Sequence, residues 1–193
     1  VAVRHRLRVG ILSTGDELAQ AGKKARPDQI YDANRPMLYA IAKAWGYKAI
    51  DLGCAPDDRA QLRVILDDAA KRCDVIITSG GASAGDEDHM SALLQGTGSL
   101  ALWRIAMKPG RPLALGLWDD VPVLGLPGNP VAAMVCTLVF GRPALRLLAG
   151  SDWLEPQGYA IPAGFTKSKK AGRREYIRAR IENGQVMAFA SEG

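Results

Sequence analysis

The sequence predicts an α/β domain with a mostly parallel sheet and helices on both faces. Through the first 150 residues, short apolar runs typical of β-strands alternate with stretches of helical periodicity. Capping residues precede the helical stretches, and loops rich in glycine and acidic residues follow the apolar runs. Strands that alternate with helices in this way usually form parallel βαβ units, so the order of the elements indicates this fold class.

Each expected strand is a short apolar run bounded by turn residues. The run at 75–78, Val-Ile-Ile-Thr, is the clearest candidate for a buried strand, because all four residues suit a sheet covered on both faces. The expected strands are residues 9–12, 48–52, 75–78, 100–107, 112–117 and 121–124.

The expected helices begin at side chains that can accept a hydrogen bond from the first turn. Asn34 is expected to cap one helix, and Asp57 or Asp58 is expected to cap the next. Asn129 precedes Pro130, which suits the first position of a helix because proline has no amide hydrogen to leave unpaired. A short helix is also expected near residues 90–94.

The pattern changes after Gly150, where only short β-like runs remain. Residues 159–161, 174–181 and 185–189 are expected to be strands, and Asn183-Gly184 is a strong signal for a hairpin turn. The last 43 residues therefore form a small β domain at most, and they could be only its beginning.

Composition and charge exclude several classes of protein. Hydrophobic residues make up 48% and charged residues 23% of the chain, which argues against global disorder. The net charge of +5 comes from the two ends, and the basic run at 167–174 is expected to be a solvated surface and not a nucleic-acid site. No stretch of 18 uncharged apolar residues is present, so we expect no membrane span, and three scattered cysteines suggest a reducing, cytoplasmic compartment.

Four loops follow the expected parallel strands and should meet at one edge of the sheet. They are residues 14–17, 56–58, 80–88 and 125–130. Carboxylates beside backbone amides are suited to Mg²⁺ and phosphate, because Mg²⁺ prefers one or two carboxylates plus phosphate oxygens. Taken singly, each acid could be only a helix cap and each glycine only a turn, so the convergence of the four loops carries the interpretation.

The usual nucleotide and hydrolase motifs are missing from the sequence. It has no GxGxxG after a strand, no GxxxxGK[ST] and no GxSxG. With only two histidines and no CxxC pair, it also offers no ordinary zinc site.

Five ordered motifs resemble the molybdopterin molybdenumtransferase family, the MoeA and gephyrin E-domain type. They are Ser13-Thr14-Gly15-Asp16-Glu17-Leu18 followed by Ile30-Tyr31-Asp32-Ala33-Asn34-Arg35, Ser79-Gly80-Gly81-Ala82-Ser83-Ala84-Gly85 with Asp88, Met107-Lys108-Pro109-Gly110-Arg111-Pro112, and Gly125-Leu126-Pro127-Gly128-Asn129-Pro130-Val131. The resemblance implies a linker at 1–7 from a missing N-terminal region and a molybdopterin-binding α/β domain of the MogA-like type at 8–150. It also implies an incomplete C-terminal β-barrel domain at 151–193, so the chain is expected to be a fragment.

The resemblance further implies a reaction and roles for residues. The family inserts molybdate into adenylylated molybdopterin and releases AMP in a step that requires Mg²⁺. The implied catalytic residues are Glu17, Asp57, Asp88 and Lys108, of which Asp57 and Asp88 would bind the metal. The implied substrate-binding residues are Thr14, Gly15, Asp16, Gly80, Gly81, Ser83, Gly85, Arg104, Pro127, Gly128, Asn129 and Pro130. Arg104 stands where lysine is frequent in the family, and His89, where an aromatic residue is frequent, is expected to be structural.

Two other functions stay open at this point. A related fold adenylylates molybdopterin in the preceding step, although the segment Gly81-Ala82-Ser83-Ala84-Gly85 with Asp88 is closer to the insertase pattern. A gephyrin-type relative also acts as a non-catalytic scaffold. The resemblance implies a homodimer and an upstream molybdopterin adenylyltransferase as a partner, together with a small-molecule substrate.

Overall fold

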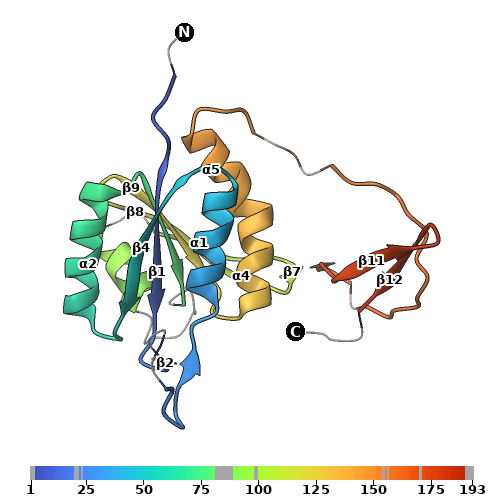
Figure 1. The fold of residues 1–193 in the computed structure, drawn as a ribbon, viewed down its shortest axis with the longest axis horizontal. Coiled ribbons are helices and arrows are strands. Elements are labelled where there is room, and N and C mark those ends of the chain that lie inside the picture. The colour runs from blue at the N-terminus through green and yellow to red at the C-terminus, as the bar shows by residue number, and fades with distance from the viewer. Residues whose placement is uncertain are drawn as a thin grey trace.

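A six-stranded sheet forms the centre of the molecule (Figure 1). The computed structural model describes residues 3–19, 22, 24–80, 89–97, 100–153, 155, 157–169 and 171–189, apart from the side chains of Leu102 and Trp103. In spatial order, the strands are β4 (Lys48–Ala55), β1 (Arg8–Thr14), β5 (Val75–Ser79), β9 (Val121–Leu126), β8 (Pro112–Trp118) and β6 (Ala101–Arg104). The first four are parallel and the last two pairings are antiparallel, which confirms the prediction of a mostly parallel sheet.

Helices cover both faces of this sheet (Figure 1). One face carries α1 (Asn34–Ala44) and a continuous helix made of α4 (Pro130–Cys136), the π-helical turn η1 (Thr137–Gly141) and α5 (Arg142–Leu148). The other face carries α2 (Arg59–Arg72) and α3 (His89–Gly96). Each expected helix is therefore present.

Alternation along the buried strands supplies both layers of the core. In β5, Val75 and Ile77 pack against the α1 and α4 layer, whereas Ile76 packs against the α2 and α3 layer. In β1, Ile11 packs against the α1 and α4 layer and Leu12 packs against the α2 and α3 layer, and neither is exposed to solvent. Successive side chains of a strand point to opposite faces, so an uninterrupted apolar run is what a sheet with two covered faces requires.

The order of the strands reverses between β1 and β5. The chain passes from β1 through α1 to β4 on one side, and then from β4 through α2 to β5 on the other side of β1. The helices α1 and α2 cover opposite faces of the sheet. In open α/β sheets, ligands bind outside the carboxyl ends of the strands at such a point.

The short strands lie outside the central sheet. The segment after β1 forms a parallel pair, β2 (Leu18–Ala19) with β3 (Ile30–Tyr31), near the carboxyl ends of β1 and β4 (Figure 1). A second parallel pair joins β7 (Met107–Lys108) to β10 (Arg174–Glu175), and β11 (Ala179–Glu182) forms an antiparallel hairpin with β12 (Gln185–Ala188). Asn183 and Gly184 both have positive φ, 48° and 76°, as a two-residue type I′ turn requires, so the predicted hairpin is confirmed.

Four local predictions were wrong. The expected strand at 100–107 is interrupted after Arg104, where Ile105 donates its amide hydrogen to the carbonyl of Arg111. Residues 159–161 form no strand, and the pairing near them among the described residues is a single bridge between Ala163 and Val186. The expected strand at 174–181 is two strands that pair with different partners. Asn34 does not cap α1, because it is a helical residue whose side chain points into the protein.

Two of the expected caps are confirmed. The Asp58 carboxylate accepts the amide hydrogen of Gln61 at the start of α2, and Asn129 Oδ1 accepts that of Ala132 at the start of α4. Because Asp58 is the cap, the side chain of Asp57 remains available at the same loop.

The helical stretch Pro130–Leu148 is long and apolar enough to cross a membrane by length and composition alone. It includes Arg142, and its buried residues, among them Ala133 and Leu145, belong to the core layer beside the sheet. One side of the stretch therefore packs against the sheet as part of the core.

We predict that Leu66→Ala lowers the free energy of unfolding by about 2–5 kcal/mol, because Leu66 is fully buried in α2 and its truncation leaves a cavity. Chemical denaturation monitored by circular dichroism measures the change. Val64→Ala on the same helix is the matched control, because Val64 is 67% exposed, and it should change stability by less than about 0.5 kcal/mol. Equal effects of the two substitutions would contradict the assignment of the buried helix face.

We also predict that Gly80→Ala destabilises the loop after β5. Gly80 has a φ of +87°, and a β-carbon there would lie 2.6 Å from the carbonyl oxygen of Thr14, a backbone atom. Strain of this kind costs on the order of 1–3 kcal/mol, which thermal denaturation can measure. Gly96→Ala is the control, because its β-carbon would meet no atom within 4 Å, and the prediction fails if both variants melt at the temperature of the unsubstituted chain.

Candidate functional site

The loops after β1 and β4 are joined by direct hydrogen bonds. Gly15 donates its amide hydrogen to the carbonyl of Ala55 at 3.3 Å, and the amide of Asp57 donates to Asp16 Oδ1 at 3.0 Å. The Glu17 carboxylate occupies the space that a β-carbon on Gly15 would need. Four acidic or glycine positions predicted for the site therefore lie at one edge of the sheet.

The loops after β1 and β5 meet at the reversal of strand order. Ser13 is paired with Ser79 in the parallel register, and Gly80 follows with its α-carbon packed against the backbone of Thr14. A residue without a side chain is needed there because the two chains approach so closely. The hydroxyl of Thr14 and the backbone of Gly80 are thus adjacent, as the prediction of a shared ligand edge requires.

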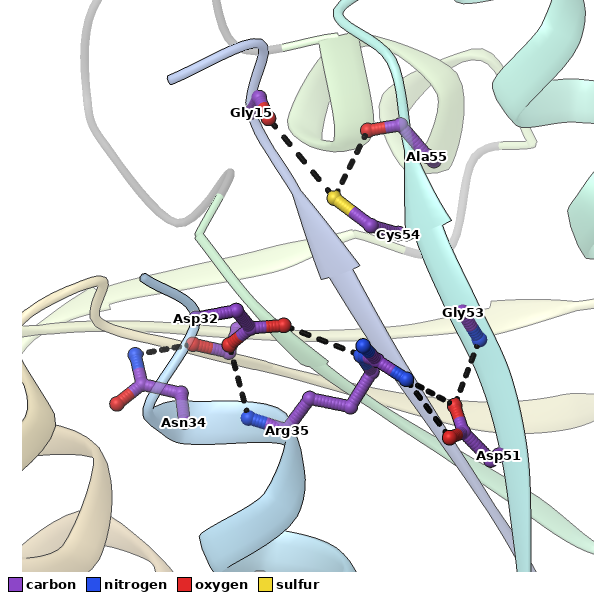
Figure 2. A network of polar contacts seen from close by, with 9 residues as sticks. Gly15, Asp32, Asn34, Arg35, Asp51, Gly53, Cys54 and Ala55 are labelled. Carbon is purple, nitrogen blue, oxygen red and sulfur yellow. Dashed lines mark hydrogen bonds and ion pairs between the residues drawn. The ribbon is translucent and has the colours of Figure 1, made fainter. Parts of the chain in front are cut away.

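Asn34 links these loops to the one that follows β9. Its Nδ2 donates to Ser79 Oγ at 2.6 Å and to the carbonyl oxygen of Gly128 at 2.7 Å. Asn34 is buried, and its Oδ1 has no hydrogen-bond partner among the described residues. Figure 2 shows Asn34 beside Asp32 and Arg35 at the start of α1. One buried side chain therefore fixes two predicted ligand loops relative to each other.

Arg35 ties the start of α1 to β4 through two carboxylates (Figure 2). Its guanidinium contacts Asp32 Oδ2 at 3.1 Å and Asp51 Oδ2 at 2.7 Å. Burial alone would raise the pKa of Asp51, but hydrogen bonds from Arg35 and the amide of Gly53 outweigh it, so this pKa lies below its usual value. Asp51 is therefore a carboxylate at neutral pH, and the network holds the first turn of α1 against the sheet.

A pocket of about 650 Å³ opens beside these loops. Its lining combines the ends of β1 and β4 with the segment that carries β2 and β3, and it consists of Gly15, Asp16, Leu18, Ala19, Lys24, Arg26, Gln29, Cys54, Ala55 and Pro56. Cys54 donates weak hydrogen bonds to the carbonyls of Gly15 and Ala55, as Figure 2 shows. Burial and the nearby Asp32 raise the pKa of the Cys54 thiol, which is therefore protonated at neutral pH.

Asp57 is the metal-ligand candidate that the structure describes. Its carboxylate is half exposed and lies 3.6 Å from Nε2 of His89, so the histidine expected to be structural adjoins the site. Within the described ranges, no group of three or more His, Cys, Asp or Glu side chains could hold a metal ion. The oxygen donors of Asp57 and Asp16 suit Mg²⁺ only in its usual arrangement with substrate phosphate oxygens, because Mg²⁺ rarely has a complete set of protein ligands.

The structure places three other predicted site residues, Pro127, Lys108 and Arg104, in different elements and at different exposures. Pro127 is buried, and the following residues Gly128, Asn129 and Pro130 are exposed at the start of α4. Lys108 is the last residue of β7. The turn that follows it packs beside α4, where the thiol of Cys136 donates a weak hydrogen bond to the carbonyl of Gly110. Arg104 is exposed at the end of β6.

Part of the predicted site lies outside the described residues. The residues concerned are Gly81, Ser83, Gly85 and Asp88. Their roles stay predictions.

Sequence reasoning missed three contributors to this region. Asn34 was identified only as a cap, although its place in the motif Asp32-Ala33-Asn34-Arg35 marks it for attention. Ser79 stands in one of the five motifs, but the resemblance implies no binding role for it. Glu175, which contacts Lys108 at 3.6 Å, had no local signal, because the two residues are 67 positions apart in the chain.

Comparison with known proteins agrees with this geometry. Residues 10–147 match the family model described as the probable molybdopterin binding domain. A molybdopterin molybdenumtransferase from Haemophilus influenzae is 38% identical over 184 residues, which cover 93% of this chain and 46% of the relative. Molybdopterin molybdenumtransferase 2 from Mycobacterium tuberculosis (strain H37Rv) is 37% identical over 193 residues, 95% of this chain and 47% of the relative.

A solved structure shares the fold as well. The molybdopterin biosynthesis MoeA protein from Pyrococcus horikosii superposes with a TM-score of 0.77 at 25% identity, covering 96% of this chain and 46% of that one. The chain thus spans about half the length of the curated relatives it matches. The resemblance stated from the five motifs is confirmed, and the match over residues 10–147 shows that the chain belongs to the family of the probable molybdopterin binding domain.

Proposed function

We propose that this chain is the part of a molybdopterin molybdenumtransferase that binds adenylylated molybdopterin and acts in molybdenum cofactor biosynthesis. The observation that carries the proposal is the convergence of the loops after β1, β4, β5 and β9 at one edge of the sheet. The relatives named as molybdopterin molybdenumtransferases supply the class of reaction. The reaction would insert molybdate at the dithiolene and cleave the phosphoanhydride to release AMP.

The residues of the convergent loops would divide the work of binding. The hydroxyl of Thr14 and the backbone amides near Gly80 would donate hydrogen bonds to phosphate oxygens. Asp57, together with Asp88, would hold Mg²⁺, which when bound neutralises charge on the phosphates and favours departure of AMP. Glu17 and Asp16 would complete the acidic side of the site beside Asp57.

Lys108 would meet the molybdate dianion as a point charge. Pro127 and Pro130 would restrict the loop that follows β9, since a proline fixes φ and reduces the freedom of its neighbours. Arg104 would add positive charge at the end of β6. With these assignments, charged side chains gather at the ligand edge, although the main body of the chain has no net charge.

We further propose a homodimer, an upstream molybdopterin adenylyltransferase as the source of substrate, and a cytoplasmic location. The support for the location is that all three cysteines are free thiols, two of them buried. Light scattering coupled to size-exclusion chromatography tests the dimer.

We predict that this chain binds adenylylated molybdopterin in a Mg²⁺-dependent manner and that Asp57→Asn weakens the binding at least tenfold. The substitution removes the negative charge that attracts the ion but keeps the size and the neighbouring backbone contacts. Isothermal titration calorimetry with and without Mg²⁺ measures both effects. Asp119→Asn is the matched control, because Asp119 lies in the turn before β9, at the opposite end of that strand, and asparagine tolerates its φ of 48°.

Two outcomes would contradict the proposal. Binding that is equally tight without Mg²⁺ and in Asp57→Asn would remove Asp57 from the metal site. Conversion of ATP and unmodified molybdopterin to an adenylate and pyrophosphate would instead identify the adenylyltransferase reaction.

A further inference from the structure

The strand β10 brings a partly buried carboxylate, that of Glu175, from the C-terminal segment to the side of Lys108. The parallel register pairs Arg174 with Met107 and Glu175 with Lys108. Two backbone hydrogen bonds of 2.8 Å fix this register, from the amide of Arg174 to the carbonyl of Ala106 and from the amide of Tyr176 to the carbonyl of Lys108. The position of Glu175 is therefore set by the backbone and not only by its own side chain.

One oxygen of Glu175 lies between two ammonium groups. Glu175 Oε1 is 3.6 Å from Nζ of Lys108 and 3.0 Å from Nζ of Lys167. The Glu175 side chain is only 14% exposed, whereas that of Lys108 is 55% exposed. The hydrogen bond from Lys167 is the main reason that the pKa of Glu175 lies below its usual value, with a smaller effect from Lys108, and burial opposes both. The carboxylate is therefore ionised at neutral pH.

A lysine side chain has a flexible four-carbon stem, so a single ammonium group is a poorly placed charge unless something holds it. The carboxylate between Lys108 and Lys167 offsets the repulsion of the two ammonium groups and restricts both stems. The two ammonium groups and the one carboxylate sum to one positive charge among these three side chains.

We propose that Glu175 is a positioning residue for the reaction, and that it holds the Lys108 ammonium group where the molybdate oxyanion must be met. This inference rests on the proposed function of Lys108. It also means that the ligand edge of the α/β domain is completed by a residue from the C-terminal segment. Preorganisation of a charged group lowers the barrier of the step that uses it, because the group need not be ordered during the reaction.

A positioning role and a role in neutralising charge predict different kinetics. A carboxylate repels an incoming dianion, so removal of the charge alone should leave KM for molybdate unchanged or lower it. Loss of the correct placement of Lys108 should lower kcat. A fall in kcat without a rise in KM is therefore the signature of positioning, provided that kcat is calculated per folded enzyme, because partial unfolding also lowers the apparent kcat and leaves KM unchanged.

The test measures AMP release from adenylylated molybdopterin at varied molybdate, using the intact enzyme that contains this chain. Glu175→Gln should lower kcat at least tenfold with KM for molybdate unchanged or lower. Added to Lys108→Met, it should have no further effect, because it acts through Lys108. Glu182→Gln is the matched control: Glu182 also forms an ion pair in the C-terminal segment, with Arg180, but it belongs to the β11–β12 hairpin, and its kcat should stay within twofold.

A second readout needs no turnover. Acetylation of single lysines by acetic anhydride, followed by mass spectrometry, should be several-fold faster at Lys108 in Glu175→Gln, because the Glu175 carboxylate no longer restricts the Lys108 stem. Lys48 in β4 is the internal reference and should not change.

The proposal is overturned if Glu175→Gln keeps kcat within twofold, if its effect multiplies with that of Lys108→Met, or if the acetylation of Lys108 is unchanged. Absence of AMP release from the unsubstituted enzyme would overturn the proposed function, and the positioning role with it. Normal AMP release that Glu175→Gln does not slow would overturn the positioning role alone.

Discussion

The close approach of Thr14 and Gly80 is the constraint on which the rest of the site depends. It exists because α1 and α2 cross to opposite faces, so that the order of the parallel strands reverses between β1 and β5. At such a reversal in an open α/β sheet, ligands bind outside the carboxyl ends of the strands. The loops after β4 and β9 begin at the same edge, because their strands run parallel to β1 and β5.

Buried and partly buried polar side chains hold these loops in one arrangement. Burying such groups is costly unless they are paired, and here Asn34 meets Ser79 and Gly128 while Arg35 meets two carboxylates. Both side chains project from the first turn of α1, so one short helical segment ties together β4, β5 and the loop after β9. The helix is thus part of the ligand edge as well as a cover for the core.

The C-terminal segment contributes to the α/β domain across a large distance in the sequence. Its strand β10 pairs with β7, and Glu175 reaches Lys108 there. The relatives that this chain matches are about twice its length. The basic run near residue 170, which composition alone suggests is a solvated surface, includes Lys167, a direct partner of Glu175.

The sequence by itself determined the fold class, the cap at Asn129, a second cap at either Asp57 or Asp58, and the hairpin turn at Asn183-Gly184. These features depend on short-range patterns: periodicity, side chains that accept hydrogen bonds from the next turn, and residues that tolerate positive φ. The family motifs also identified loops that the structure brings together. Tertiary structure alone decided that Asn34 bridges two loops and does not cap its helix, and that Glu175 contacts Lys108. Those contacts join residues 45 to 94 positions apart, and no local pattern records which distant group a side chain will meet.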